Sequence, residues 1–255
     1  MIYQEQQGQG ADIVLIHGWG MHGGIWAAVA ERLAQRYRVT RVDLPGHGNS
    51  PMPAGGFDLP RLARMVMDDV PQPATWVGWS LGGMVAMQAA IQQPQAVNTL
   101  VTVASLPQFV RGDDWPDAMP RGTLSGFADH LQENYPATLK RFLALQVRGT
   151  ENERELLRLI QQQVASRPQP APEALRLGLE ILRTSNLRPQ LNQLNCPCHL
   201  FFGERDMLVP IKAARAMHAL LPQARRHTIA GAGHAPFLSH LDIFLSELEF
   251  SLSQQ

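Results

Sequence analysis

Apolar residues recur along the first part of the chain in two alternating patterns, short continuous runs and longer amphipathic segments. The short runs predict buried strands, and the amphipathic segments predict helices. The predicted elements are, in order, a strand at 12–16, a helix at 25–35, a strand at 37–42, a helix at 59–70, a strand at 74–79, a helix at 81–91 and a strand at 97–104. Strands that alternate with helices predict a parallel sheet with right-handed crossovers.

The alternation stops after this last strand, and residues from about Gln108 to about Leu187 read almost entirely as helix. The four helices predicted there span 124–134, 138–147, 151–165 and 172–183. The strand pattern then resumes with a strand at 199–202, a helix at 211–220, a strand at 225–229 and a helix at about 241–252. We therefore predict an α/β core made of residues 1–108 and 188–255, with residues 109–187 inserted as a helical cap over the carboxyl edge of the sheet.

The amino-acid composition and the net charge argue against two classes of protein. The 255 residues are 45% hydrophobic and 17% charged, with 22 basic and 22 acidic residues, so the formal net charge is zero. This balance argues against a nucleic-acid binder, which normally has a basic excess, and against a disordered chain, which combines low hydrophobicity with high net charge. The stretch from Val70 to Val110 has no charged residue or histidine, but prolines and glutamines interrupt it. It therefore predicts elements buried on several sides of a core rather than a membrane span.

The two cysteines and the N-terminus bear on the compartment. Cys196 and Cys198 stand one residue apart, a spacing that rarely closes a relaxed disulfide, so we expect two small buried residues at the start of a strand. The first ten residues are polar and lack the basic and then apolar pattern of a signal peptide. We expect a cytoplasmic monomer.

The strongest local signal is the pentapeptide Gly78-Trp-Ser-Leu-Gly82, which Gly83 follows. It lies between a predicted strand and a predicted helix, the setting that a G-x-S-x-G nucleophile elbow requires. Glycines on both sides of Ser80 let the strand and the helix approach closely. Ser80 is therefore the candidate nucleophile, at a helix N-terminus that favours developing negative charge.

A serine nucleophile needs a base and an acid on loops after later strands, in the order Ser, Asp or Glu, His. His234 follows the last predicted strand, within a loop that has glycines on its N-terminal side. Asp206 follows the preceding predicted strand, and its role would be to fix the tautomer of His234 and stabilise the imidazolium. Glu204 competes for that role. We favour Asp206 because the loop then has room to bend before Val209.

The segment His17-Gly-Trp-Gly20 follows the first predicted strand, where a second oxyanion donor is expected. We expect the backbone N–H groups of Trp19 and Leu81 to hold the oxyanion, and the Trp19 side chain to wall the acyl pocket. His17 and His47 are assigned structural roles. His234 and His240 have no third ligand beside them, so no metal site is predicted.

Together these residues resemble the α/β-hydrolase superfamily along the whole chain. Several segments are similar to one family within it, the pimeloyl-acyl-carrier-protein methyl ester carboxylesterases of biotin synthesis. The more discriminating segments are GWSLGG, and RFLALQ with GTE in the predicted cap, beside LIHGWGMHGGIW, VDLPGHGNS, DDWP, GLEILRTSNLR and GHAPFLSH. The resemblance implies a mostly parallel sheet flanked by helices, with an inserted helical cap. It also implies hydrolysis of the methyl ester to the free acid and methanol, with no cofactor.

The resemblance also assigns residues. It places catalysis on Ser80, Asp206 and His234, and substrate binding on Trp19, Leu81 and Phe142. The substrate of that family is tethered to an acidic acyl-carrier protein, and docking of that partner requires a basic patch. The candidates for such docking in the cap sequence are Lys140, Arg141, Arg148, Arg154 and Arg158. Because glutamates lie among them, an ordinary solvated face is the alternative.

Other functions stay open. One is a general short-chain carboxylesterase, and another is a C–C bond hydrolase of the same fold. A third is a non-catalytic receptor that keeps the fold. A serine rather than an aspartate at position 80 disfavours haloalkane dehalogenases and epoxide hydrolases.

Overall fold

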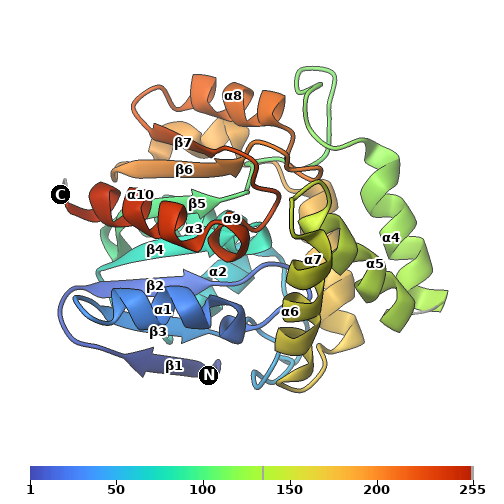
Figure 1. Ribbon diagram of the computed structural model, residues 1–255, viewed down its shortest axis with the longest axis horizontal. Helices are drawn as coiled ribbons and strands as arrows, with labels where there is room; N and C mark the ends of the chain where they lie inside the picture. The colour runs from blue at the N-terminus through green and yellow to red at the C-terminus, as the bar shows by residue number, and fades with distance from the viewer. Residues whose placement is uncertain (134, 254–255) are drawn as a thin grey trace.

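A seven-stranded sheet forms the centre of the computed structural model, which describes residues 1–133 and 135–253 (Figure 1). Its strand order is β1-β3-β2-β4-β5-β6-β7, and each neighbouring pair is parallel except β1 and β3. The strands are β1 (Gln4–Gln7), β2 (Asp12–Ile16), β3 (Arg38–Val42), β4 (Ala74–Trp79), β5 (Val97–Val103), β6 (Cys198–Gly203) and β7 (Arg225–Ile229). The predicted mostly parallel sheet is thus confirmed.

Helices cover both faces of this sheet. In the view of Figure 1, α1 and α10 lie in front of it, and α2 and α3 lie behind it. The core helices are α1 (Ala27–Leu33), α2 (Leu59–Met67), α3 (Leu81–Gln92), α8 (Ile211–Leu220), α9 (Pro236–Ser239) and α10 (Leu241–Ser253). Short 3₁₀ turns are η1 (Gly23–Trp26), η2 (Pro94–Ala96) and η3 (Arg188–Gln193). The helix predicted at 25–35 is therefore divided between η1 and α1.

Strand β4 and helix α3, which lie within the charge-free stretch, are buried almost throughout. All six residues of β4 are buried, and α3 is buried from Leu81 to Ile91. A helix that is apolar on every side needs cover on every side, and α3 packs between α2, β4 and β5. A charged side chain in β4 or on the buried part of α3 would be desolvated without a partner, which explains why these two elements contain none.

The strand order places a topological switch point beside β2. The chain runs from β2 to β3 on one side and then returns to β4 on the other side. In open parallel sheets, ligands bind beyond the carboxyl ends of the strands at such a switch point. The loops that begin there carry Trp19 after β2 and Ser80 after β4.

Four helices between β5 and β6 form the cap. They are α4 (Arg121–Glu133), α5 (Tyr135–Val147), α6 (Glu153–Ala165) and α7 (Pro172–Thr184). Figure 1 shows them beyond the arrowheads of the parallel strands. Two side chains of the core bind cap carbonyls. Trp19 Nε1–H donates to Leu175 O at 2.8 Å, and His22 Nε2–H donates to Gln163 O at 2.6 Å.

A buried ion network holds the segment between α6 and α7. Arg167 contacts Asp43 at 2.7 Å and Glu5 at 2.6 Å. Asp43 is fully buried at the end of β3, and its carboxylate also accepts the N–H groups of Gly23 and Asn49. The Arg167 guanidinium contributes to holding the pKa of the Glu5 carboxyl below its usual range. The pairing fixes the cap to β1 and β3.

Strand β1, the two cysteines and the lengths of the helices bear on the remaining expectations. Strand β1 was not predicted, because Gln4–Gln7 is wholly polar and is stabilised by pairing with β3. Cys198 is buried at the start of β6 as expected, whereas Cys196 is only half-buried, and both thiols are free. Among the described helices, none has the length and apolar character needed to cross a membrane.

Candidate active site

Ser80 stands at a sharp turn between β4 and α3. Its backbone has φ 55° and ψ −116°, a conformation that costs about 1–3 kcal/mol for a residue other than glycine. The turn is tight because the backbone packs closely around the flanking glycines. A Cβ on Gly78 would overlap the Gly82 carbonyl, and a Cβ on Gly82 would lie 2.5 Å from His17 O. Ser105 Oγ–H donates to Ser80 O at 2.7 Å and supports the turn. Ser80 therefore has the backbone conformation of a nucleophile elbow.

His234 and Asp206 meet beyond the ends of β6 and β7. His234 Nδ1 lies 2.8 Å from Asp206 Oδ2, and the two residues are 1% and 5% exposed. Because the carboxylate accepts, Nδ1 carries the proton and Nε2 is left as an acceptor. Nε2 is buried and has no hydrogen-bond partner in the described part of the chain. Such a nitrogen is available to accept the proton of a serine hydroxyl.

The carboxylate of Asp206 is itself fixed. Its Oδ1 accepts the N–H groups of Leu208 at 2.8 Å and Val209 at 2.9 Å, so the oxygen that faces His234 is determined by the loop backbone. The competing acid, Glu204, is exposed, and its Oε2 accepts the N–H of Gly231 at 3.0 Å. The structure thus places Asp206, and not Glu204, against the histidine.

Two contacts that the sequence did not reveal hold the backbone of His234. Trp79 Nε1–H donates to His234 O at 2.8 Å, and His234 N–H donates to Gln146 O at 3.1 Å. Trp79 immediately precedes the candidate nucleophile Ser80, and its side-chain N–H donor was the one signal in the sequence for the first of these contacts. Gln146 contributes its main-chain carbonyl from α5, and a carbonyl has no sequence signature.

The candidate oxyanion donors lie on the two loops at the switch point. The N–H groups of Trp19 and Leu81 have no hydrogen-bond partner among the described residues. Leu81 is the first residue of α3, where a backbone N–H has no partner within its helix. Both N–H groups are therefore free to donate to a negatively charged oxygen.

The predicted pocket residues lie together where the cap meets the core. The rings of Trp19 and Phe142 are T-shaped, with centroids 4.7 Å apart. Gly178 of α7 packs over the same place, because a Cβ there would lie 2.7 Å from Trp19 Cδ1 and 3.4 Å from Leu81 Cδ2. The structure thus brings all three predicted residues, Trp19, Leu81 and Phe142, to one apolar wall.

The other histidines of this region have structural contacts. His17 Nδ1–H donates to Gly18 O at 2.7 Å, and its Nε2 accepts the N–H of Leu44 at 2.8 Å. Burial lowers the pKa of His17 well below its usual range and that of His47 to about 4, so both rings are neutral at pH 7. His240 Nδ1 lies 2.8 Å from Ser239 Oγ.

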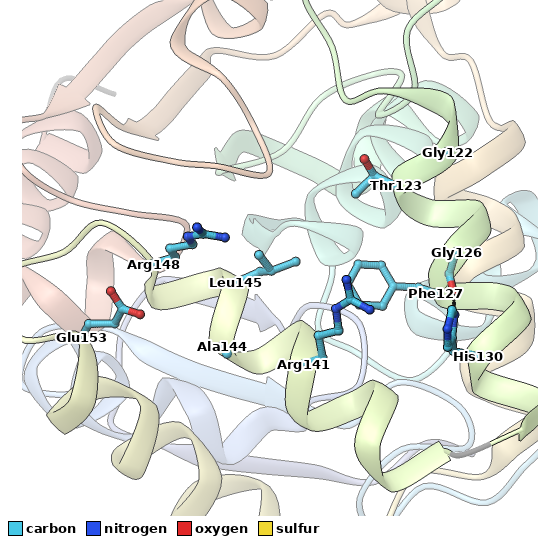
Figure 2. A pocket seen from close by; sticks show the side chains of 10 residues that line it. All are labelled: Gly122, Thr123, Gly126, Phe127, His130, Arg141, Ala144, Leu145, Arg148 and Glu153. Carbon is cyan, nitrogen blue, oxygen red and sulfur yellow. Dashed lines mark hydrogen bonds between the residues drawn. The ribbon is translucent and has the colours of Figure 1, made fainter.

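A pocket of about 740 Å³ lies between α4 and α5 on the cap (Figure 2). Arg141 of α5, and Arg148 directly after that helix, line it opposite Phe127 and His130 of α4. The Arg141 guanidinium lies 5.9 Å from the centre of the Phe127 ring. That ring is in turn T-shaped on Phe142, with centroids 5.5 Å apart. Glu153 also lines this pocket. Aromatic contacts therefore run from the pocket to the wall that contains Trp19.

The predicted docking residues are on two neighbouring cap helices. Lys140 and Arg141 lie on α5, and Arg154 and Arg158 lie on α6. All four side chains are exposed, and none forms an ion pair with a described residue. Three exposed glutamates at positions 151, 153 and 155 lie among them, so the surface is mixed in charge with unpaired cations.

Comparison with known proteins gives a consistent result. Residues 13–241 match the alpha/beta hydrolase fold family. The chain is 47% identical over 239 residues to a pimeloyl-[acyl-carrier protein] methyl ester esterase of Methylococcus capsulatus, covering 94% of this chain and 93% of that relative. It is 42% identical over 253 residues to the protein of the same name in Aliivibrio fischeri, covering 99% and 98%. In fold it is similar to an esterase from Exiguobacterium antarcticum, with a TM-score of 0.89 at 24% identity over 98% of this chain and 95% of that one.

Proposed function

Because the chain belongs to the alpha/beta hydrolase fold family, we propose that it is a serine carboxylesterase of biotin biosynthesis. It hydrolyses the methyl ester of pimeloyl-[acyl-carrier protein] methyl ester to give pimeloyl-[acyl-carrier protein] and methanol. The observation that carries the substrate is the near full-length similarity to relatives named for that reaction. The hydrogen-bonded pair of His234 and Asp206, on loops at the same edge of the sheet as the Ser80 elbow, supports the chemistry.

Acylation uses the unpartnered nitrogen of the histidine. His234 Nε2 accepts the proton of Ser80 Oγ while that oxygen attacks the ester carbonyl, and a bond forms between Oγ and the carbonyl carbon. The N–H groups of Trp19 and Leu81 stabilise the oxyanion, and the N-terminus of α3 adds its dipole. The bond to the methoxy oxygen then breaks, and His234 returns the proton to that oxygen, so that methanol leaves.

Deacylation repeats these steps with water. His234 Nε2 takes a proton from water, the hydroxide attacks the acyl carbonyl, and the bond to Ser80 Oγ breaks. The proton returns to Ser80, and the carboxylic acid is released. Asp206 stays ionised throughout, holds the Nδ1 proton in place and stabilises the imidazolium.

The cap supplies recognition. The wall of Trp19, Leu81 and Phe142 contacts the apolar acyl chain next to the ester. We place the acidic carrier on the exposed cations of α5 and α6, which have no acidic partner among the described residues. The pocket beside Arg141 and Arg148 offers two guanidinium groups to the phosphodiester of the carrier's phosphopantetheine arm.

The test is hydrolysis of the carrier-bound methyl ester by the intact chain and by Ser80→Ala, which removes the nucleophile and leaves the apolar core unchanged. We expect Ser80→Ala to lower turnover by at least ~10⁴-fold, with an unaltered thermal midpoint. Esterase activity retained in Ser80→Ala would contradict the assignment. Complementation of a biotin auxotroph that lacks this step separates the proposed enzyme from a general short-chain esterase, which would hydrolyse a p-nitrophenyl ester without rescuing growth.

Compartment and assembly are part of the proposal. The proposed carrier-bound biosynthetic substrate supports a cytoplasmic reaction, and a single chain carrying Ser80, Asp206 and His234 is compatible with a monomer. We therefore propose a cytoplasmic monomer, and light scattering of the purified protein tests the assembly state.

A further inference from the structure

The C-terminal turn of α5, residues 146–150, lies against the loop that carries His234. Gln146 O accepts the His234 N–H at 3.1 Å. Gly233 lets the two segments approach, because a Cβ there would lie 3.0 Å from Thr150 Cγ2 and 3.2 Å from Gln146 O. A side chain at position 233 would push the cap and the histidine loop apart.

Hydrogen bonds within the turn and from Arg205 hold residues 146–150 in place. Thr150 Oγ1–H donates to Val147 O at 2.6 Å and closes the end of the helix. Gly149 has φ +86°, which reverses the chain, and Arg205 Nη1–H donates to its carbonyl at 3.3 Å. Since Arg205 precedes Asp206, one turn of the cap contacts the loops of both the histidine and its carboxylate.

The histidine loop depends on such external contacts. Glycines at 231 and 233 give the chain before His234 little conformational preference of its own. Its main chain is held from the cap by Gln146 O and from β4 by Trp79 Nε1. The ring itself is held by Asp206, so removing or shifting one of these two contacts displaces the main chain that carries the ring and changes its position relative to Ser80.

We propose that this turn of α5 positions His234, so that the seating of the cap on the core sets the alignment of the base with the nucleophile. The inference rests on the proposed function, because it concerns the same histidine. Gly233 and Thr150 are then positioning residues. A misplacement of about 1 Å in an active site can lower the rate about 10²-fold, and shifts of a few tenths of an ångström should give smaller losses.

Two pairs of variants test this on a p-nitrophenyl ester, which needs no carrier. We expect Gly233→Ala to lower kcat about 10-fold with little change in KM, whereas Gly112→Ala, where a Cβ meets nothing closer than 3.4 Å, should not. Thr150→Val keeps the volume but loses the bond to Val147 O, and should lower kcat several-fold. Thr150→Ser keeps that bond and should match the intact chain. It should also restore part of the activity of Gly233→Ala by removing Cγ2.

The pH profile separates positioning from general damage. In both damaging variants the acidic limb of kcat/KM should move to lower pH, because an imidazolium that is less well aligned with Asp206 is less stabilised. Thermal unfolding identifies a variant that fails to fold, and the Thr150 pair then decides. Folded Gly233→Ala and Thr150→Val proteins with unchanged kcat and pH profile would overturn the inference. Absence of ester hydrolysis by the intact chain would instead contradict the proposed function.

Discussion

Replacing Asp206 by asparagine should invert the tautomer of His234, and the loop backbone predicts the direction. Oδ1 accepts two N–H groups, from Leu208 and Val209, and Oδ2 faces His234 Nδ1 at 2.8 Å. The amide oxygen of the introduced asparagine must take the Oδ1 place, because an NH₂ group there would face two donors. The NH₂ group then donates to Nδ1, so the imidazole proton moves to Nε2, the nitrogen that has to accept from Ser80.

The size of the effect follows from these contacts. The opposite amide orientation would leave two buried N–H groups unpaired, at about 1–3 kcal/mol each. The minimum of about 2 kcal/mol for the two groups favours the wrong tautomer by at least ~30-fold. Loss of the negative charge beside the imidazolium adds to this, and the same substitution in a serine protease lowers kcat about 10⁴-fold. We expect a fall of about 10³–10⁴-fold here, which corresponds to about 4–5.5 kcal/mol in activation free energy.

The assay is kcat on a p-nitrophenyl ester at neutral pH, with the imidazole tautomer read by ¹⁵N NMR. Glu204→Gln is the matched control, because Glu204 carries the neighbouring carboxylate but binds Gly231 N–H, and it should stay within about 2-fold of the intact chain. Thermal stability of Asp206→Asn should be little changed, since both N–H bonds persist. An Asp206→Asn variant that keeps more than a tenth of the activity, or a Glu204→Gln variant that loses as much as Asp206→Asn, would contradict the role of Asp206.

Three further outcomes are expected. Arg167→Gln leaves the fully buried Asp43 carboxylate without its cation, and should lower the free energy of unfolding, measured by urea titration, by about 3 kcal/mol. Arg176→Gln breaks an exposed ion pair, and should lower the same free energy by less than about 1 kcal/mol. Burial lowers the pKa of His47 to about 4, so between about pH 6.5 and 4 the unfolded chain binds a proton at this residue that the folded chain does not bind. The free energy of unfolding should therefore fall by up to about 3 kcal/mol as the pH drops through this window, and His47→Gln should make this pH dependence less steep. Arg141→Glu should raise KM for the carrier-bound ester, most strongly at low salt, and leave kcat/KM for a p-nitrophenyl ester unchanged; equal losses on both substrates would argue against docking on α5.

Much of the fold could be predicted because its elements are long and strongly patterned. The run at 12–16 and the helix at 211–220 agree with β2 and α8 to the residue. Strand β1 could not be predicted, because four polar residues become a strand only when β3 is beside them to pair with. Helix α9 was also missed, since its four residues are too few for a periodic pattern.

For the site, the sequence indicated residue types and loops but not the contacts that orient them. Both Asp206 and Glu204 lay on a suitable loop, and the distinction came from which carboxylate reaches Nδ1. The contact from Gln146 to His234 uses main-chain atoms and joins positions 88 residues apart, so no local pattern could report it. The catalytic roles of these residues stay predictions for the experiments above.

The cap's attachment to the core has a consequence for how such enzymes diverge. Four of its contacts with the core use cap carbonyls, those of Gln146, Gly149, Gln163 and Leu175. A carbonyl is present whatever the side chain, so point substitutions across the cap can retune substrate choice while these contacts persist. An insertion or deletion within a cap helix would instead displace the carbonyls themselves. Engineered libraries should therefore vary side chains and keep helix lengths constant.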